Sequence, residues 1–219
     1  MPVPQYRYRR ILLKLSGESL KGDLAHGYDA AAVAQIVQRI AAVATAGVQV
    51  AIVVGAGNLW RGMVGTAWGM DRVAADQMGM LATAMNALCL RDACRAAGLD
   101  AEAQSAIPMG TVLPPYDRQQ ALAALAAGRV VIFGGGTGCP FFTTDTTAAL
   151  RALEIGAEAV LKATKVDGIY TDDPLKNPAA RRYAKLSYEE ALAGRLKIMD
   201  ATAFSLCQDH ALPIIVFNF

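Results

Sequence analysis

The chain has 219 residues, of which 54% are hydrophobic and 18% charged, so it has ample material for a core and too little charge for a disordered chain. Its 21 basic and 19 acidic residues are spread along the sequence, and the net charge of +2 does not favour a nucleic-acid-binding role. Four cysteines without a CxxC pair, together with two histidines, suggest neither a zinc site nor a disulfide framework and fit a reducing cytoplasm.

One stretch, residues 40–60, carries no charge and is long enough to raise the question of a membrane span. Its first part is rich in alanine and ends at Gly47, whereas residues 48–54 are largely β-branched and stop at Gly55. This pattern predicts a helix, a turn, a buried strand and a second turn. Because residues 1–10 are polar and basic, we expect no apolar leader and no membrane association, and a cytoplasmic protein.

In chain order, short apolar runs alternate with helical patterns. Runs that are continuously apolar suit central parallel strands that helices cover on both faces, so we predict a three-layer α/β/α sandwich with a mainly parallel sheet. The predicted strands are 10–15, 48–54, 101–105, 130–133, 159–163 and 214–217. The predicted helices are 29–46, 71–97, 118–127, 144–155, 188–194 and 200–210. The expected helix signals are N-caps at Asp29, Ser187 and Asp200, and glycines past the helix ends at Gly47, Gly98, Gly128 and Gly156.

The first loop with chemical potential follows the first predicted strand, since ligands of open parallel sheets bind outside the carboxyl ends of strands. It contains Lys14, Leu15, Ser16 and Gly17. Backbone N–H groups of this turn and the charge of Lys14 suit phosphate oxygens, and an exposed lysine at a strand end is the alternative. A Walker A loop is excluded, because Asp23 occupies the position that would require lysine.

The second loop, residues 55–62, is rich in glycine and closes with an arginine. Gly57 lets the backbone approach an anion closely, and the guanidinium of Arg61 offers a fork of donors to phosphate. Trp60 stands where a dinucleotide-binding fingerprint needs its third glycine, so the loop does not match that motif.

The strongest signal is the segment 133–145, a glycine run followed by hydroxyls and a carboxylate that open a helix. Flexible backbone, hydroxyl donors and a helix N-terminus together favour a phosphate. Asp145 suits either holding Mg²⁺ through water or orienting a charged lysine. A tight turn before a well-capped helix is the alternative. Further along, residues 162–174 offer a ring, hydroxyls and carboxylates that suit adenosine, with an Asp-rich turn as the alternative.

Six segments in order between Arg10 and Asn218 resemble those of bacterial UMP kinases, which belong to the amino-acid-kinase superfamily. They are LLKLSGE, GAGNLWRG, MGMLAT, TGCPFFTTD, LKATKVDGIYTDDP and HALPIIVFN. The resemblance implies the amino-acid-kinase (carbamate-kinase-like) fold and transfer of the γ-phosphate of ATP, bound with Mg²⁺, to UMP in pyrimidine nucleotide biosynthesis. It also implies a homohexamer that GTP activates and UTP inhibits.

The resemblance also implies site residues. The ATP contacts it implies are Lys14, Leu15, Ser16, Gly17, Gly57, Arg61, Thr164, Tyr170 and Asp173. The UMP contacts it implies are Ala56, Asp76, Thr137, Gly138, Cys139, Pro140, Phe141, Phe142, Thr143 and Thr144. Residues 22–27 match the GTP-responsive segment. Because a nucleotide phosphate has a second pKa near roughly 6, the acceptor needs no general base. We expect Lys14 and Arg61 to neutralise charge, and Asp145 to orient a lysine or the metal.

Three departures from the family pattern stand out. Ala56 replaces a frequent glycine, Cys139 replaces the usual asparagine, and relatives continue beyond Phe219, so we expect a single domain over residues 1–219 that is shortened at its C-terminus. Two other functions stay open: a carboxylate or carbamate kinase on the same fold, and a nucleotide-binding storage or sensor protein without turnover. The PFFTTD segment and Asp76 favour a nucleotide acceptor.

Two side-chain clusters lie outside the loop segments. The first is basic and consists of Arg7, Arg9 and Arg10. We expect it to be a solvated start of the first strand rather than a phosphate contact. The second is apolar and consists of Met78, Met80 and Met85. We expect it to pack in the core or against another subunit rather than to bind a ligand.

Overall fold

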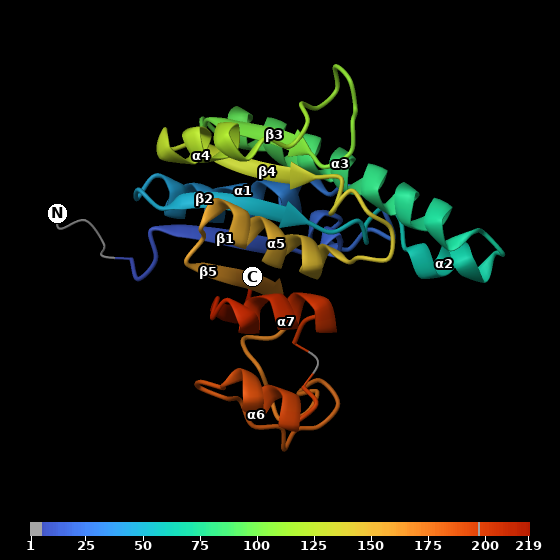
Figure 1. Ribbon diagram of the computed structural model, residues 1–219, viewed down its shortest axis with the longest axis vertical. Coiled ribbons are helices and arrows are strands. Elements are labelled where there is room, and N and C mark those ends of the chain that lie inside the picture. Colours follow the sequence, from blue (N-terminus) through green and yellow to red (C-terminus); the bar gives the residue numbers. More distant parts are fainter. Residues whose placement is uncertain (1–5, 197) are drawn as a thin grey trace.

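The computed structural model describes residues 6–196 and 198–219, and its centre is a six-stranded sheet with helices on both faces (Figure 1). The strands are β1 (Arg10–Leu15), β2 (Gln49–Val54), β3 (Ala101–Ser105), β4 (Val130–Gly134), β5 (Ala159–Thr164) and β6 (Ile214–Asn218). Their order in the sheet is β3-β4-β2-β1-β5-β6, and all five pairings are parallel. The predicted three-layer α/β/α fold is confirmed.

The helices begin and end close to the predicted positions. They are the 3-10 helix η1 (Gly17–Leu20), α1 (Ala30–Ala44), α2 (Gly62–Ala67), α3 (Arg72–Ala96), α4 (Arg118–Ala126), α5 (Thr144–Ile155), α6 (Tyr188–Ala193) and α7 (Ala201–Asp209). Sequence analysis missed η1 and α2, because elements of four and six residues are too short to show a periodic pattern. The predicted caps are confirmed, since the side chains of Asp29, Ser187 and Asp200 accept backbone N–H groups from their helices.

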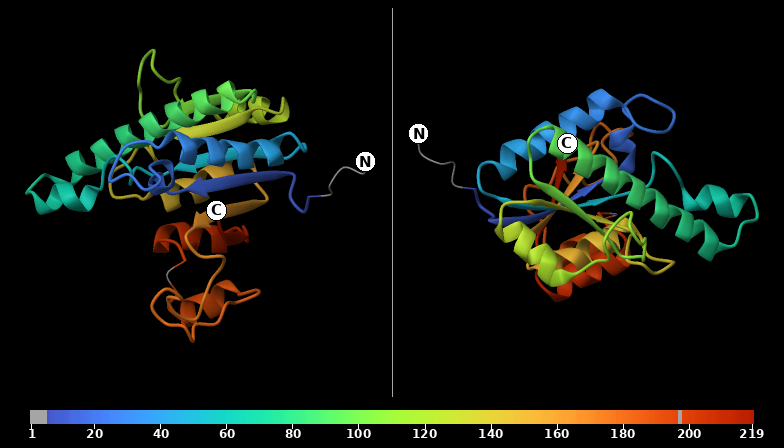
Figure 2. Two further views of the ribbon diagram at one scale, coloured as in Figure 1. Left: turned by 180° about the vertical axis from the view of Figure 1, so that it is seen from behind. Right: turned by 90° about the horizontal axis from the view of Figure 1, so that it is seen from above.

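Helices cover both faces of the sheet (Figure 2), and each face builds its own hydrophobic core. Leu13 and Ile52 point to the face that α1 and α3 cover, whereas Leu12 and Phe133 point to the face that α4, α5 and α7 cover. Side chains on both faces of the central strands are therefore buried, which explains why their sequences are continuously apolar rather than alternating.

The uncharged stretch 40–60 divides as predicted into the end of α1, a turn, the buried strand β2 and a second turn. Gly47 allows the first turn because its φ of 90° lies in the left-handed region. Within the described residues, no helix combines the length and apolarity that crossing a bilayer demands. The expectation about an apolar leader concerns residues 1–10, and residues 1–5 lie outside the described part of the chain.

The order of connections positions the candidate site at the carboxyl edge of the sheet. Strands β1 and β2 lead to α1 and α3 on one face, whereas β3, β4 and β5 lead to α4, α5 and α7 on the other. Neighbouring strands therefore turn in opposite directions at two places, between β1 and β5 and between β2 and β4. Such switch points open crevices for ligands in parallel sheets. The loops with chemical signals follow β1, β2, β4 and β5, so they all meet there.

Candidate active site

At the first switch point, a carboxylate lies between two lysines. Lys14 on β1 and Lys162 on β5 are register partners on adjacent strands. Asp145, in the first turn of α5, places Oδ1 2.8 Å from Nζ of Lys14 and Oδ2 2.7 Å from Nζ of Lys162. The three side chains are only 13%, 16% and 14% exposed for Lys14, Lys162 and Asp145. The cluster is therefore held in place by contacts that water screens weakly.

The positive charges of Lys14 and Lys162 stabilise the ionised form of Asp145. Burial opposes the ionisation of Asp145, but the charges and hydrogen bonds of Lys14 and Lys162 outweigh it and hold the pKa of this carboxyl below its ordinary value. Two cations against one anion leave a net positive charge, and fixed positive charge stabilises a phosphoryl group in transfer. Of the two roles considered for Asp145, this geometry favours the orientation of lysines.

Lys162 is a member of this cluster that sequence analysis did not select. Its signal was the same as that of Lys14: each is a lysine that interrupts an apolar strand near its carboxyl end. Lys14 was selected because a Ser-Gly turn follows it directly. Lys162 was not selected, because the residues that follow it were interpreted as contacts for adenosine.

The loops after β1 and β2 pack closely against each other. A Cβ atom on Gly17 would lie 2.4 Å from the carbonyl oxygen of Gly55, so this approach requires glycine. Behind them, the buried amides of Asn58 and Asn86 exchange hydrogen bonds of 2.8 and 3.1 Å, and Asn86 also donates to the Gly55 carbonyl at 2.7 Å. Sequence analysis missed this pair, which fixes the second loop on α3.

Arg61 lies at the mouth of the site rather than inside it. Its Nη2 is 2.6 Å from Oε1 of Glu18, and its side chain is 65% exposed. The hydrogen bond from Arg61, aided by the charges of Arg61 and Lys21, lowers the pKa of Glu18 and outweighs the opposing effect of burial. The predicted contact of Arg61 with phosphate stays a prediction.

A cavity of about 160 Å³ lies at the second switch point, between the loop after β2, α3 and the segment after β4. Seven of the predicted UMP contacts line it: Ala56, Asp76, Thr137, Cys139, Phe142, Thr143 and Thr144. Gly138, Pro140 and Phe141 lie on the same segment but are not among the lining residues of this cavity. Trp60, Met80 and Thr83 line it and were not selected from the sequence. We refer to this space as the acceptor cavity.

Asp76 holds the loop beside the acceptor cavity. Its Oδ2 accepts a hydrogen bond from the backbone N–H of Phe141 at 2.8 Å, and both carboxylate oxygens accept from Nε of Arg72 at 2.9 and 3.0 Å. Phe141 has a φ of 72°, which is costly for a residue other than glycine. The guanidinium of Arg72 also lies 5.5 Å from the centroid of the Phe141 ring. Asp76 therefore stabilises a strained loop conformation, while its predicted contact with a ribose stays untested.

A larger cavity of about 680 Å³ lies beyond the carboxyl end of β5. The three residues predicted to contact adenosine, Thr164, Tyr170 and Asp173, all line it. Lys162 and Ile198 line it as well, so this space opens on the lysine cluster. We refer to it as the donor cavity.

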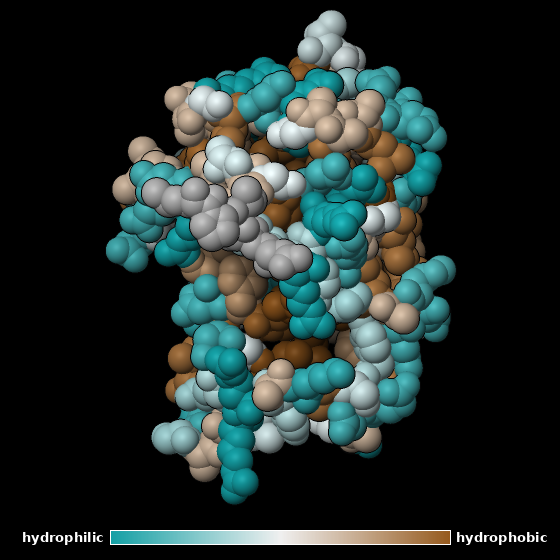
Figure 3. All heavy atoms as spheres, turned by 90° about the vertical axis from the view of Figure 1, so that its left-hand side faces the viewer, coloured by the Kyte–Doolittle hydropathy of each residue, from teal (hydrophilic) through white to brown (hydrophobic). Residues whose placement is uncertain are grey.

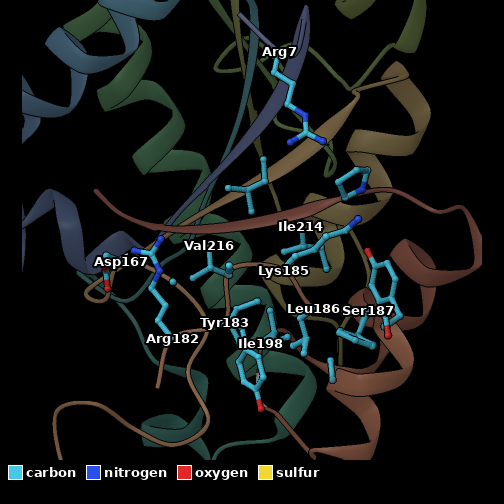
Figure 4. A pocket seen from close by; sticks show the side chains of 18 of the residues that line it. Arg7, Asp167, Arg182, Tyr183, Lys185, Leu186, Ser187, Ile198, Ile214 and Val216 are labelled. Atoms are coloured by element: carbon cyan, nitrogen blue, oxygen red, sulfur yellow. Dashed lines mark hydrogen bonds and ion pairs between the residues drawn. The ribbon is translucent and has the colours of Figure 1, made fainter. Parts of the chain in front are cut away.

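A third cavity, of about 760 Å³, lies beside the edge strand β6 and contains none of the predicted site residues (Figure 4). Ile214, Val216 and Ile198 line its apolar part, and Arg7 and Lys185 lie at its rim. The face at the amino ends of the strands shows this apolar hollow (Figure 3).

The two clusters outside the loops differ in their surroundings. Arg7 and Arg9 are exposed, while Arg10 donates to Oε1 of Gln49 at 2.6 Å at the amino end of β1, away from the acceptor and donor cavities. The basic cluster is thus the start of a strand, as predicted. The three methionines do not form one face: Met80 is buried and lines the acceptor cavity, whereas Met78 and Met85 are exposed on α3.

Comparison with known proteins places this arrangement in a family. Residues 9–218 match the amino acid kinase family. The chain belongs to this family. Among solved structures, the UMP kinase of Bacillus anthracis is 38% identical, with a TM-score of 0.93, and the match covers 96% of this chain and 87% of that one. The resemblance inferred from the six sequence segments is confirmed.

Two further solved structures are similar to this chain. The UMP kinase of Ureaplasma parvum is 37% identical, with a TM-score of 0.92, and the match covers 98% of this chain and 91% of that one. The uridylate kinase of Archaeoglobus fulgidus is 28% identical, with a TM-score of 0.74, over 95% of this chain and 90% of that one. The predicted fold class is confirmed by these structures as well as by the sheet itself.

Proposed function

We propose that this amino acid kinase transfers the γ-phosphate of MgATP to UMP and so forms ADP and UDP. The observation that carries the proposal is the Lys14–Asp145–Lys162 cluster between two cavities. Lys162 lines the donor cavity, and Thr144, which precedes Asp145 in the chain, lines the acceptor cavity. The likeness to two UMP kinases at 37–38% identity supports uracil as the base.

The chemistry follows from the charges. The acceptor phosphate is largely dianionic at neutral pH, so the chain needs to align two polyanions and neutralise the charge that gathers on the transferring group. Lys14 and Lys162 supply positive charge at fixed positions, because Asp145 holds both ammonium groups. Positions fixed before the reaction cost no reorganisation during it, which makes such charges effective in the transition state.

Mg²⁺ in kinases is held by one or two carboxylates together with the phosphates of the substrate. Asp145, the carboxylate of the lysine cluster, is engaged by both Lys14 and Lys162. This observation fits a Mg²⁺ ion that the ATP phosphates bring. When bound, the ion neutralises phosphate charge and thereby adds to the effect of Lys14 and Lys162.

The proposal includes regulation and assembly: activation by GTP, inhibition by UTP, a homohexamer, and a place in cytoplasmic pyrimidine nucleotide biosynthesis. The GTP-responsive role of residues 22–27 is supported by two hydrogen bonds between Gly27 and Asn58, of 2.9 and 3.1 Å. Through Asn58, this segment contacts the loop that carries Gly57. Assembly is supported by exposed apolar side chains on α3, among them Leu81 and Met85.

A coupled assay of ADP release tests the proposal directly. UMP, CMP, acetylglutamate and carbamate are offered in turn with MgATP. We expect release with UMP to be fastest. Release with acetylglutamate or carbamate alone would identify a carboxylate or carbamate kinase, and release with none of the four would point to a nucleotide-binding protein without turnover.

A further inference from the structure

Residues 137–144, which follow β4 and contribute to the lining of the acceptor cavity, are called the acceptor segment. Asp200 lies next to this segment, although it comes more than fifty residues later in the chain. Its carboxylate accepts a hydrogen bond from Oγ1 of Thr143 and one bifurcated hydrogen bond from Oγ1 of Thr146, at 3.0 Å to Oδ1 and 3.1 Å to Oδ2. It also accepts the backbone N–H of Ala203 at 3.0 Å and so caps α7. One side chain therefore joins the first turns of α5 and α7, which lie side by side (Figure 1).

Thr143 transmits this contact to the reacting groups. Its Oγ1 accepts the backbone N–H of Asp145 at 3.0 Å and of Thr146 at 3.4 Å, and its side chain lines the acceptor cavity. A hydroxyl group has one hydrogen to donate. Because Thr143 donates that hydrogen to Asp200, its lone pairs face the backbone of α5, and the direction of the hydroxyl is set from outside the helix.

A second contact joins the residues just before Asp200 to the lysine cluster. The carbonyl oxygen of Ile198, two residues before Asp200, accepts a hydrogen bond from Nζ of Lys162 at 2.6 Å. Ile198 also lines the donor cavity. Residues 198–200 therefore contact the acceptor segment at one end and the donor side at the other.

From this geometry we infer that Asp200 is a positioning residue for phosphoryl transfer. It fixes the Thr143 hydroxyl and the first turn of α5, and through them Asp145 and the two lysines that Asp145 holds. Asp200 itself lines neither cavity within the described residues. The inference rests on the proposed kinase activity and adds to it a residue that the reacting atoms do not touch.

The substitution Asp200→Ser separates the two roles of the Asp200 carboxylate, which caps α7 and accepts hydrogen bonds from two threonine hydroxyls. Serine caps a helix about as well as aspartate, so Asp200→Ser keeps the cap of α7, but its shorter side chain loses both threonine hydroxyls. Because small misplacements in an active site cost up to about a hundredfold in rate, we expect kcat to fall roughly 10- to 100-fold. The KM for UMP should rise, since Thr143 lines the acceptor cavity, and the KM for ATP should change by less than about twofold.

The matched control is Asp117→Ser. Asp117 caps α4 by accepting the N–H of Gln120 at 2.9 Å, and it lines neither cavity in the described part of the chain. Its substitution makes the same chemical change at a helix start, so kcat and both KM values should stay at wild-type levels. Melting temperatures of the two variants show whether capping is preserved equally.

Asp200→Asn serves if Asp200→Ser does not fold, because asparagine also caps helices and matches aspartate in shape. Its single carbonyl oxygen cannot accept from both threonines and Ala203 as the carboxylate does, so kcat should again fall. The inference is overturned if folded Asp200→Ser, or folded Asp200→Asn in its place, has the kinetics of Asp117→Ser. Failure of the proposed function looks different, because the wild-type chain would then release no ADP with UMP.

Discussion

Nζ of Lys162 lies 2.7 Å from Oδ2 of Asp145, and this contact identifies a second lysine of the candidate site. If both lysines neutralise charge on the transferring group, Lys14→Ala and Lys162→Ala should each lower kcat by about 10²- to 10³-fold, with a much smaller rise in the KM for UMP. Steady-state kinetics with MgATP and UMP measure both quantities. Lys185→Ala, at an exposed lysine beside the third cavity, is the control and should be near wild type. Near-normal turnover of either active-site variant rejects the role of that lysine.

The lowered pKa of Asp145 predicts a specific dependence of stability on pH. A carboxylate with a depressed pKa in the folded state stabilises the fold above its unfolded pKa of about 3.9, and this stabilisation is lost as the pH falls through the folded value. Asp145→Asn should therefore lower the free energy of unfolding by about 3 kcal/mol between pH 5 and 8, since it leaves two lysines without their partner. Urea unfolding at several pH values measures the difference. It should shrink only below pH about 4, whereas a constant difference down to pH 3 contradicts the ion-pair explanation.

Asp76 is predicted to accept hydrogen bonds from the ribose of UMP as well as from the loop. Loss of one charged hydrogen bond costs roughly 1.5 to 3 kcal/mol, or about ten- to hundredfold, so wild type should prefer UMP to dUMP by that factor. Asp76→Ala should narrow the ratio of kcat/KM for the two nucleotides and relieve inhibition by UTP. Arg72→Ala keeps the carboxylate and should preserve the ratio. An unchanged ratio and unchanged UTP inhibition in Asp76→Ala would falsify the ribose contact.

Cys139 lines the acceptor cavity with its side chain exposed, and its backbone N–H and C=O are both hydrogen-bonded to Oγ1 of Thr137. These backbone contacts do not depend on the side chain. Cys139→Asn should therefore retain activity, and the added amide should lower the KM for UMP. The measurement is the KM for UMP at saturating MgATP. Abolished turnover in a folded variant would show that the thiol itself is required.

The exposed apolar side chains of α3 predict how copies of the chain assemble. Met78, Leu81 and Met85 are spaced by three and four residues, so they lie on one side of the helix, and all three are exposed. Multi-angle light scattering at micromolar concentration should find a hexamer. Leu81→Glu should reduce the assembly size, whereas Leu192→Glu, at an exposed leucine of α6, should not. A monomeric wild-type chain would contradict the proposal.

Much of the fold was predictable from local patterns. The buried strands β1, β2, β4 and β5 each contain an uninterrupted apolar run, which Lys14 and Lys162 end in β1 and β5, and capping side chains such as Asp29 and Ser187 mark the helix starts. A strand that helices cover on both faces needs apolar residues at nearly all positions, so consecutive residues are enough to reveal it. The 3-10 helix η1 and the six-residue α2 could not be predicted, since they are too short for a period to appear.

The sequence by itself also indicated the segments that line the candidate site. Lys14 was selected because it precedes a Ser-Gly turn that suits phosphate, and Asp145 because it opens a helix after a glycine run, whereas Asp76 was selected through the resemblance to bacterial UMP kinases. Only the tertiary structure decided which of them act together. Lys162 was not selected from the sequence and Asp200 was predicted only as a helix cap; their proposed roles arise from parallel pairing of β5 with β1 and from the packing of α7 on α5. Parallel strands bring distant carboxyl ends to one edge through long crossovers, so the contacts between them leave no pattern at short range in the chain.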